Sequence, residues 1–436
     1  MHMRTLIAGA SALAFSAVIA STTIAAERIE FMFPAPVQGK LSREMQSLVK
    51  EFNGSQADVE VVGVFTGSYD DTKIKSQAAA EAGKPPAVVL MSANFVAELA
   101  MNDLIVPMDE LMAGSSTAPE AFIEEFWPAV RANAHFNGKL LAVPFQNSTP
   151  ILYYNKEHFA EAGIAKAPET WSEWVAAAKK LAKAGGERWG IMMPSNYDYN
   201  GWLVQALTMS NGGQFYNTAY PGEIYYDHAS TRGALGFWRD LAHEHRVMPT
   251  GVTDSKQVST SFFSGKSSMI VLSTGALSFV RENAKFDYDV AFIPRNVRNA
   301  VPIGGASLVS FKGTTPEQKK AAWTFISWLT SPEKIGHWSR FTGYFSPRQT
   351  AYDLPEMKAF IARNPDALRA VEQLKYAQPW IATYNTVGVR KAVEDQMQAL
   401  LGDPSLSVDE AAAKAQRDAD ELMKPYIDKT AGALVN

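Results

Sequence analysis

The stretch Pro144-Phe-Gln-Asn-Ser-Thr-Pro-Ile-Leu-Tyr-Tyr-Asn-Lys156 decides the fold of this chain. Its order predicts a polar turn over residues 146–149, then a short apolar strand, then a helix that ends at Gly163. Thr170 and Glu173 have the spacing of a capping box, which opens a second helix. Strand and helix therefore alternate here, as in an α/β fold.

The composition is that of a large folded protein. At 436 residues the chain is too long for one ordinary core, so we expect two domains. Hydrophobic residues make up 47% of the chain and charged residues 20%, which excludes a disordered protein. The formal net charge of −4 argues against nucleic acid as a partner. The absence of cysteine excludes disulfides, thiolate metal sites, a catalytic cysteine and the acylated cysteine of a bacterial lipoprotein.

The first residues have the pattern of a secretory signal. Arg4 supplies a positive start, residues 6–20 are apolar, and small residues follow at Ala25 and Ala26. The apolar run is short for a membrane span, which needs about 20 residues. We therefore expect residues 1–26 to be a signal peptide and the mature protein to be periplasmic. The alternative is an uncleaved membrane anchor.

Apolar spacing predicts βαβ units along the chain. Residues 29–33 alternate as a strand would, and residues 41–52 have helical spacing. Residues 59–65 and 87–91 read as further buried strands. This order predicts a mostly parallel sheet.

Later helices have recognisable starts. Thr315 with Pro316 and Gln318 combines an N-cap, a first-turn proline and a capping-box glutamine. Ser407 and Glu410 have the same capping-box spacing and predict the last helix.

The stretch from Pro144 resembles the lobe-crossing segment of the family 1 extracellular solute-binding proteins of ABC importers. Those proteins carry a Leu-Tyr-Tyr-Asn-Lys strand, a Phe-x-x-Ala-Gly helix and Pro-x-Thr-Trp, all of which occur here. Within that family the chain is most similar to the sn-glycerol-3-phosphate-binding type. The narrower match lies in Phe262-Phe-Ser-Gly-Lys-Ser-Ser-Met269, Ser273-Thr-Gly275, Ile303-Gly-Gly-Ala-Ser-Leu308, Thr342-Gly-Tyr344 and Ala351-Tyr-Asp-Leu354.

The resemblance implies a two-lobed α/β fold, the type II periplasmic binding protein fold, with the ligand in the interlobe cleft. Residues 27–145 and 304–350 would form lobe 1, and residues 146–303 and 351–436 lobe 2. The flexible connections would lie near Gln146 and Gly304. The resemblance also implies a monomer that captures a small phosphorylated molecule and delivers it to an inner-membrane ABC permease, without catalysis, metal or cofactor.

The family's ligand contacts fall on identifiable positions of this sequence. The resemblance assigns the phosphate and glycerol contacts to Tyr69, Ser148, Ser273, Gly305, Tyr344 and Arg390. We take Asn94, Gln146, Trp202 and Trp380 as further candidate contacts. Each position also has a plain structural interpretation: serines in such turns commonly bond the backbone, paired glycines form tight turns, and a lone arginine is often a solvated helix residue.

One position departs from the family pattern. Ala93 stands where the family has an acidic residue that accepts hydrogen bonds from the glycerol hydroxyls. The early Trp-His of the family is also replaced, by Met32 and Phe33. We therefore expect sn-glycerol-3-phosphate held by a shifted acceptor, a glycerophosphodiester, or another phosphorylated polyol.

Two alternatives stay open. The first keeps the fold but binds a neutral sugar or oligosaccharide through the aromatic residues. The second is a secreted phosphodiesterase, although the sequence shows no cluster of His, Asp and Glu for it and no P-loop, Gly-x-Ser-x-Gly or His-Glu-x-x-His motif. His243 and His245 are two residues apart, so they point to different sides of a helix and do not form a metal pair.

Overall fold

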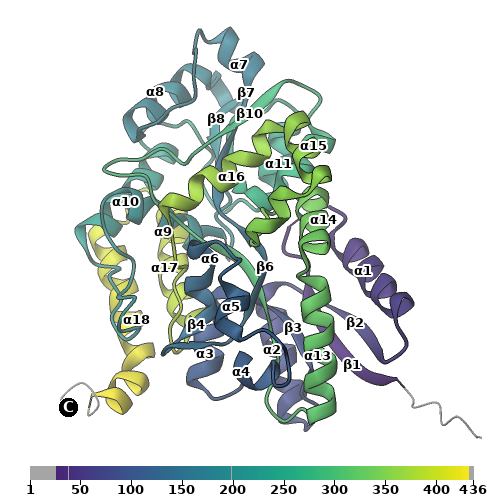
Figure 1. The fold of residues 1–436 in the computed structure, drawn as a ribbon. Coiled ribbons are helices and arrows are strands. Elements are labelled where there is room, and N and C mark those ends of the chain that lie inside the picture. Colours follow the sequence, from purple (N-terminus) through teal and green to yellow (C-terminus); the bar gives the residue numbers. More distant parts are fainter. Residues whose placement is uncertain (1–25, 38, 198, 432–436) are drawn as a thin grey trace, which may run out of the picture.

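We describe a computed structural model of the chain, in which residues 26–431 are described except residues 38 and 198. The predicted signal peptide, but for residue 26, lies outside the described residues. No helix in the described part of the chain has the length and apolar character needed to cross a membrane. Two sheets organise the molecule, one in the lower half of Figure 1 and one in the upper half.

The first sheet has five strands in the order β2-β1-β3-β12-β6. Its strands are β1 (Glu27–Pro34), β2 (Val59–Gly67), β3 (Val88–Ser92), β6 (Val143–Ser148) and β12 (Gly304–Val309). β1 runs parallel to β2 and β3, whereas β12 is antiparallel to β3 and β6. The predicted early strands and the helix over residues 41–52 are confirmed by β1, β2, β3 and α1 (Leu41–Ser55).

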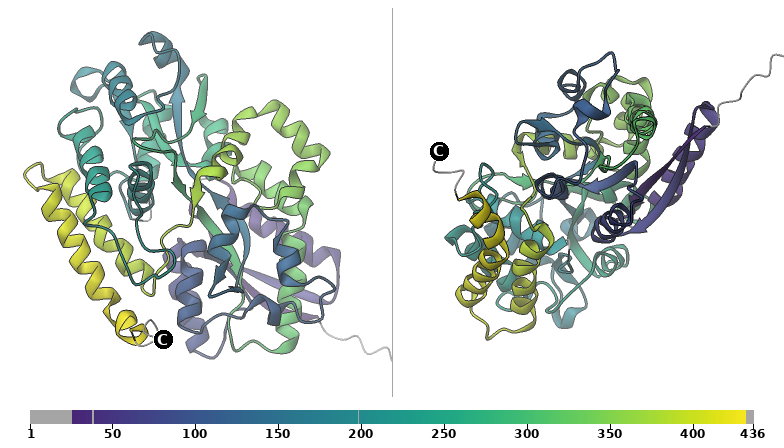
Figure 2. Two further views of the ribbon diagram at one scale, coloured as in Figure 1. Left: turned by 60° about the vertical axis from the view of Figure 1, so that its left-hand side comes forward. Right: turned by 90° about the horizontal axis from the view of Figure 1, so that it is seen from below.

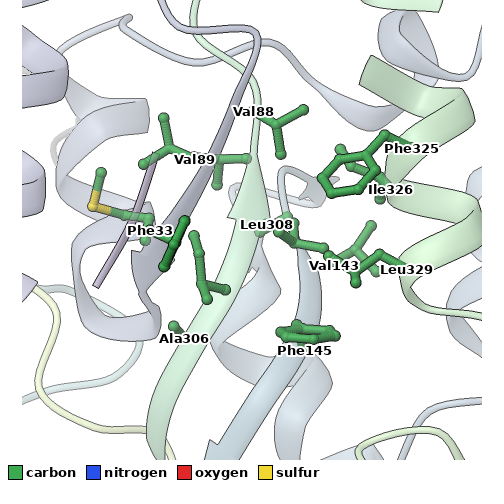
Figure 3. Close-up of a cluster of buried hydrophobic side chains, with 14 of the residues drawn as sticks. Phe33, Val88, Val89, Val143, Phe145, Ala306, Leu308, Phe325, Ile326 and Leu329 are labelled. Carbon is green, nitrogen blue, oxygen red and sulfur yellow. The ribbon is translucent and has the colours of Figure 1, made fainter. Parts of the chain in front are cut away.

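The core of this part of the molecule is aromatic and aliphatic (Figure 3). Every residue of β3 is buried, so this strand is covered on both faces. Phe31 packs edge-on against Phe325 of α13 (Pro316–Leu329), with ring centroids 5.1 Å apart. The predicted capping box at Thr315 is present at the start of α13. Further helices of this region are α2 (Tyr69–Glu81), α3 (Val96–Met101), α4 (Met108–Leu111), α5 (Pro119–Ile123) and α6 (Pro128–Arg131), and β4 (His135–Phe136) pairs with β5 (Lys139–Leu140).

The second sheet has four strands in the order β10-β7-β9-β8. They are β7 (Pro150–Asn155), β8 (Trp189–Met192), β9 (Ser267–Ser273) and β10 (Tyr288–Ala291). β8 and β9 are parallel, but β7 is antiparallel to both of its neighbours. The prediction of a mostly parallel sheet is therefore wrong for this part, because apolar spacing reports burial and not the direction in which a strand crosses the sheet.

Helices surround the second sheet. Their bounds are α7 (Lys156–Glu161), α8 (Trp171–Leu181), α9 (Tyr199–Ser210), α10 (Ala229–Ala242), α11 (Ser255–Phe263), α12 (Leu277–Asn283), α17 (Thr386–Gly402) and α18 (Val408–Thr430). The predicted capping box at Thr170 opens α8, Gly163 follows α7 with φ +65°, and Ser407 caps α18. Figure 2 shows α17 and α18 side by side along one flank of the molecule.

The chain passes between the two cores three times. Phe145 belongs to the first core and Leu152 to the second, and β6 and β7 are separated by Thr149 alone. The chain returns between Val301 and Ile303.

A third passage lies between Leu374 in the first core and Trp380 in the second, further along the chain than the change of lobe after residue 350 that the family resemblance implied. There β13 (Ala377–Gln378) pairs in parallel with β11 (Val301–Pro302), after α14 (Pro332–Thr342), α15 (Pro355–Arg363) and α16 (Leu368–Gln373). The side chains of Ala351 and Ala370 also pack in the first core. The residue ranges of the two lobes stay a prediction.

Candidate ligand-binding site

A cavity of about 120 Å³ lies where the three passages meet. Its lining includes Tyr69 and Tyr344 from the first core and Trp202 and Trp380 from the second. The cavity is therefore shared by the two halves of the molecule. The described lining consists of Pro36, Val37, Ser68, Tyr69, Ser148, Asn196, Tyr197, Tyr199, Trp202, Ser255, Ser273, Gly304, Gly305, Tyr344 and Trp380. Of the predicted contacts, Tyr69, Ser148, Ser273, Gly305, Tyr344, Trp202 and Trp380 lie here together.

The pairing of β6 with β12 forms one wall. Gly304 lies opposite Ser148 in this antiparallel ladder. Gly305 has φ +92°, and a Cβ there would meet the carbonyl oxygen of Gln146 at 1.9 Å, so no other residue fits. A Cβ at Gly304 would meet the Trp202 ring at 2.7 Å. The two glycines thus let an indole ring approach the strand closely.

The start of α2 forms a second wall. Ser68 caps this helix: its hydroxyl accepts from the Asp71 amide at 3.1 Å, and the Asp71 carboxylate accepts from the Ser68 amide at 3.0 Å. The backbone N–H of Ser68 is the main cause of a lowered pKa of Asp71, and its hydroxyl adds to it. The capping box fixes the first turn, which places Tyr69 at the cavity, where its hydroxyl accepts from Gln146 Nε2 at 3.2 Å.

Ser273 and Tyr344 form a third wall. The Ser273 hydroxyl accepts from the Gly275 amide at 3.0 Å, which is the turn-bonding role common for serine at such positions. The Tyr344 ring lies on that turn, since a Cβ at Gly275 would be 2.6 Å from it. Burial raises the pKa of Tyr344 well above its usual value, and the neighbouring hydroxyls of Tyr69 and Tyr199 raise it further. Tyr344 therefore interacts electrostatically with two further tyrosines of the cavity lining.

The remaining wall is aromatic. Trp202 and Trp380 have ring centroids 6.2 Å apart, and Tyr199 meets Trp202 edge-on at the same separation. Among the described residues, the indole N–H groups of Trp202 and Trp380 have no hydrogen-bond acceptor. The described lining includes no Lys, Arg, Asp or Glu. The cavity thus offers hydroxyls, backbone amides and aromatic faces, but no formal charge of its own among the described residues.

Arg390 lies beside this cavity and does not line it. It is buried, and its Nη2 is 2.9 Å from Asp70 Oδ2, while its Nε is 3.1 Å from Glu394 Oε1. Asp70 directly follows Tyr69, so the ion pair adjoins the cavity wall. The alternative reading of Arg390 as a solvated helix residue is wrong, because the side chain is 2% exposed.

Asn94 and Gln146 are also buried, and neither lines the cavity. The Asn94 side-chain oxygen accepts from the Ser92 hydroxyl at 2.7 Å, and Gln146 bonds the Tyr69 hydroxyl. Ala93 is buried as well. Within the described residues no group of three or more His, Cys, Asp or Glu side chains is placed to hold a metal ion.

Comparison with known proteins decides the family. Residues 47–386 match the profile of the family described as bacterial extracellular solute-binding protein. The chain belongs to this family. Its members are the substrate-binding components of ABC importers: they carry small molecules to a membrane permease and are not enzymes.

Two relatives of the same name are similar to this chain over most of its length. The sn-glycerol-3-phosphate-binding periplasmic protein UgpB of Yersinia pestis is 29% identical over 400 residues, covering 85% of this chain and 87% of its own. The protein of the same name from Escherichia coli K12 is 28% identical over 418 residues, covering 90% and 91%.

Solved structures share the two-lobed α/β fold that the sequence predicted. UgpB from Mycobacterium tuberculosis in complex with glycerophosphocholine has a TM-score of 0.81 and 24% identity, covering 92% of this chain and 100% of its own. Maltose-bound MalE3 of T. maritima has a TM-score of 0.78 and 23% identity, covering 90% and 99%. The predicted fold is thereby confirmed for this solute-binding protein.

The sequence missed several residues that line the cavity. The capping box of Ser68 with Asp71 is visible in the sequence and marks a helix start at the site. Asp254 and Gln257 form another capping box, which marks the helix start at Ser255. No comparable signal marks Tyr197 or Tyr199. The remaining missed lining residues are Pro36, Val37, Asn196 and Gly304.

Proposed function

We propose that this solute-binding protein captures a phosphorylated polyol, sn-glycerol-3-phosphate or a glycerophosphodiester, in the periplasm and delivers it to an ABC permease. One observation carries the proposal: five residues that the family resemblance assigns to the ligand line a single cavity shared by both halves. They are Tyr69, Ser148, Ser273, Gly305 and Tyr344. The names of the relatives at 28–29% identity support the same ligand class.

The chemistry of the cavity suits the phosphate of such a ligand. Hydroxyl groups and backbone N–H groups at glycine turns hold phosphate oxygens without a metal. The Ser148 and Ser273 hydroxyls and the backbone of β12 at Gly304 and Gly305 line the cavity and would supply such groups. Because the walls come from both halves, a ligand that bonds both would favour the closed arrangement over an open one.

A neutral sugar is the second candidate. The described lining holds the aromatic side chains Tyr69, Tyr197, Tyr199, Tyr344, Trp202 and Trp380, and no charged residue. Sugar rings stack on such faces, and maltose-bound MalE3 shares the fold. In this case Trp202 and Trp380 would supply the affinity, and Arg390 would contribute little. A phosphodiesterase is disfavoured, since no His, Asp or Glu occurs in the described lining.

Calorimetric titration with sn-glycerol-3-phosphate, glycerophosphocholine and maltose separates these candidates. The proposal predicts saturable binding of at least one phosphorylated ligand and none of maltose. Tight maltose binding without a response to either phosphate would overturn it.

The variant Ser148→Ala tests whether this cavity binds the phosphate ligand. Loss of one hydroxyl hydrogen bond, about 0.5–1.5 kcal/mol, should weaken phosphate binding by roughly two- to tenfold. The matched control is Ser264→Ala, which removes an exposed hydroxyl outside the cavity and should leave the affinity unchanged.

A further inference from the structure

Two carboxylates of the described residues contact the Arg390 guanidinium. Glu394 lies one turn further along α17, on the same face, with its Oε1 3.1 Å from Arg390 Nε. Both side chains pack against α9 at Gly201, where a Cβ would be 2.7 Å from Glu394 Oε1 and 2.8 Å from Arg390 Cγ. Glu394 is 1% exposed, so it is a permanent part of this buried pair.

The second carboxylate comes from the other half of the molecule. Asp70 belongs to α2, which packs on the first sheet, and its Oδ2 is 2.9 Å from Arg390 Nη2. Its side chain is 28% exposed, unlike that of Glu394. Asp70 therefore bridges the two halves and is the more accessible of the two carboxylates. It also directly follows Tyr69, a lining residue of the cavity.

The described charges of this group do not cancel. Among the described residues, the one guanidinium and the two carboxylates that contact it sum to about −1, beside a cavity whose described lining is uncharged. Asp70 Oδ2 occupies Arg390 Nη2, so an anionic ligand that bonds this nitrogen competes with Asp70.

We propose that Asp70 is a specificity-determining residue, which occupies Arg390 in the unliganded protein and selects against dianionic phosphate monoesters in favour of phosphodiesters. This inference rests on the proposed function and adds to it a choice between the two ligand classes. The phosphate group of a monoester carries a charge of about −1.5 to −2 at pH 7, whereas that of a phosphodiester carries about −1, which the choline cation balances in glycerophosphocholine. The extra charge of the monoester meets the carboxylates of Asp70 and Glu394.

The test compares two ligands on three proteins. The affinities of sn-glycerol-3-phosphate and glycerophosphocholine are measured by calorimetry at pH 7.5 and low salt for the wild type, Asp70→Asn and the control Glu81→Gln. Glu81 ends the same helix, is exposed and lies outside the cavity lining, so the control changes the net charge equally. Asparagine keeps the shape of Asp70 but removes its charge.

We expect the wild type to bind the diester more tightly. Removing one unit charge beside the cavity should raise the affinity of Asp70→Asn for sn-glycerol-3-phosphate by roughly tenfold or more. The affinity for glycerophosphocholine should change by less than about threefold, and Glu81→Gln should behave as the wild type. The ratio of the two affinities is the decisive readout, because a merely structural role of Asp70 would change both affinities alike.

Two results would overturn the inference in distinguishable ways. If both ligands bind and Asp70→Asn leaves their ratio unchanged or weakens both equally, Asp70 only links the two halves, and the proposed function stands. If neither ligand binds to any of the three proteins, the proposed function fails and this inference with it.

Discussion

The indole ring of Trp202 lies directly on Gly304: a methyl group built on Gly304 would be 2.7 Å from Trp202 Cζ2. The same methyl group would be 3.2 Å from the Ser148 hydroxyl. Strand β12 of the first sheet therefore packs closely against α9 of the second half at the cavity. Several consequences of this arrangement can be measured.

Gly304→Ala should disturb the cavity. The added Cβ forces the Trp202 ring off the strand, so we expect phosphate-ligand affinity to fall by roughly tenfold and the free energy of unfolding by about 1–3 kcal/mol. Ligand titration and urea unfolding followed by tryptophan fluorescence measure both. The control is Gly54→Ala in α1, where no atom lies within 4 Å of the new Cβ. It should raise stability by up to about 1 kcal/mol without changing affinity.

Trp202 should contribute to both stability and ligand affinity, whereas Trp171 should contribute to stability alone. Trp171 opens α8 and stacks on Phe237, with ring centroids 4.2 Å apart, away from the cavity. Trp171→Ala should lower the free energy of unfolding by about 3–5 kcal/mol and leave the affinity of the folded protein unchanged. Trp202→Ala should lower both stability and affinity. Equal losses of affinity in the two variants would contradict the assignment of Trp202 to the site.

Arg390→Gln should have a stability cost as well as an affinity cost. It leaves the buried carboxylate of Glu394 without its charge partner, and breaking a buried pair in this way costs about 3–5 kcal/mol. Urea unfolding measures this loss. Phosphate-ligand affinity should fall by at least roughly tenfold, the scale of a lost charged hydrogen bond.

Arg28→Gln is the control for Arg390→Gln, since its ion pair with Glu60 is exposed and should contribute at most about 1 kcal/mol. A dissociation constant unchanged by Arg390→Gln would remove Arg390 from the ligand site.

The raised pKa of Tyr344 should make the free energy of unfolding fall as the pH rises into the alkaline range. Burial raises the pKa of Tyr344 in the folded state, so the folded protein keeps a proton that the unfolded chain loses near pH 10. Its contribution to stability is complete below about pH 10 and is lost as the pH rises above it. Urea unfolding between pH 8 and 11 should show a steeper fall for the wild type than for Tyr344→Phe. Parallel curves would contradict this contribution.

Much of the fold follows from local sequence. The capping boxes at Thr170 and Thr315 and the alternation over residues 29–33 predict elements that the structure contains, because these signals act within one turn or one strand. Strand direction in the second sheet and the place of the third passage, after Leu374 and not after residue 350, depend on pairing between distant segments. No local pattern reports such pairing.

The residues of the candidate site also fall into those that sequence motifs identify and those that only the tertiary structure reveals. Ser148, Gly305 and Tyr344 were identified through motifs that resemble those of the family, and the structure brings them to one cavity. Tyr199 and Asp70 were not identified, because their place at or beside the cavity depends on how the two halves meet.

A crystal structure of the protein with the tighter-binding phosphorylated ligand tests the central claim most directly. We predict ligand density between the two halves, with the phosphate in hydrogen-bond distance of Ser148, Ser273 and the Gly305 backbone. Density for the ligand outside this cavity, or a cavity filled by a sugar while both phosphates fail to bind, would contradict the account.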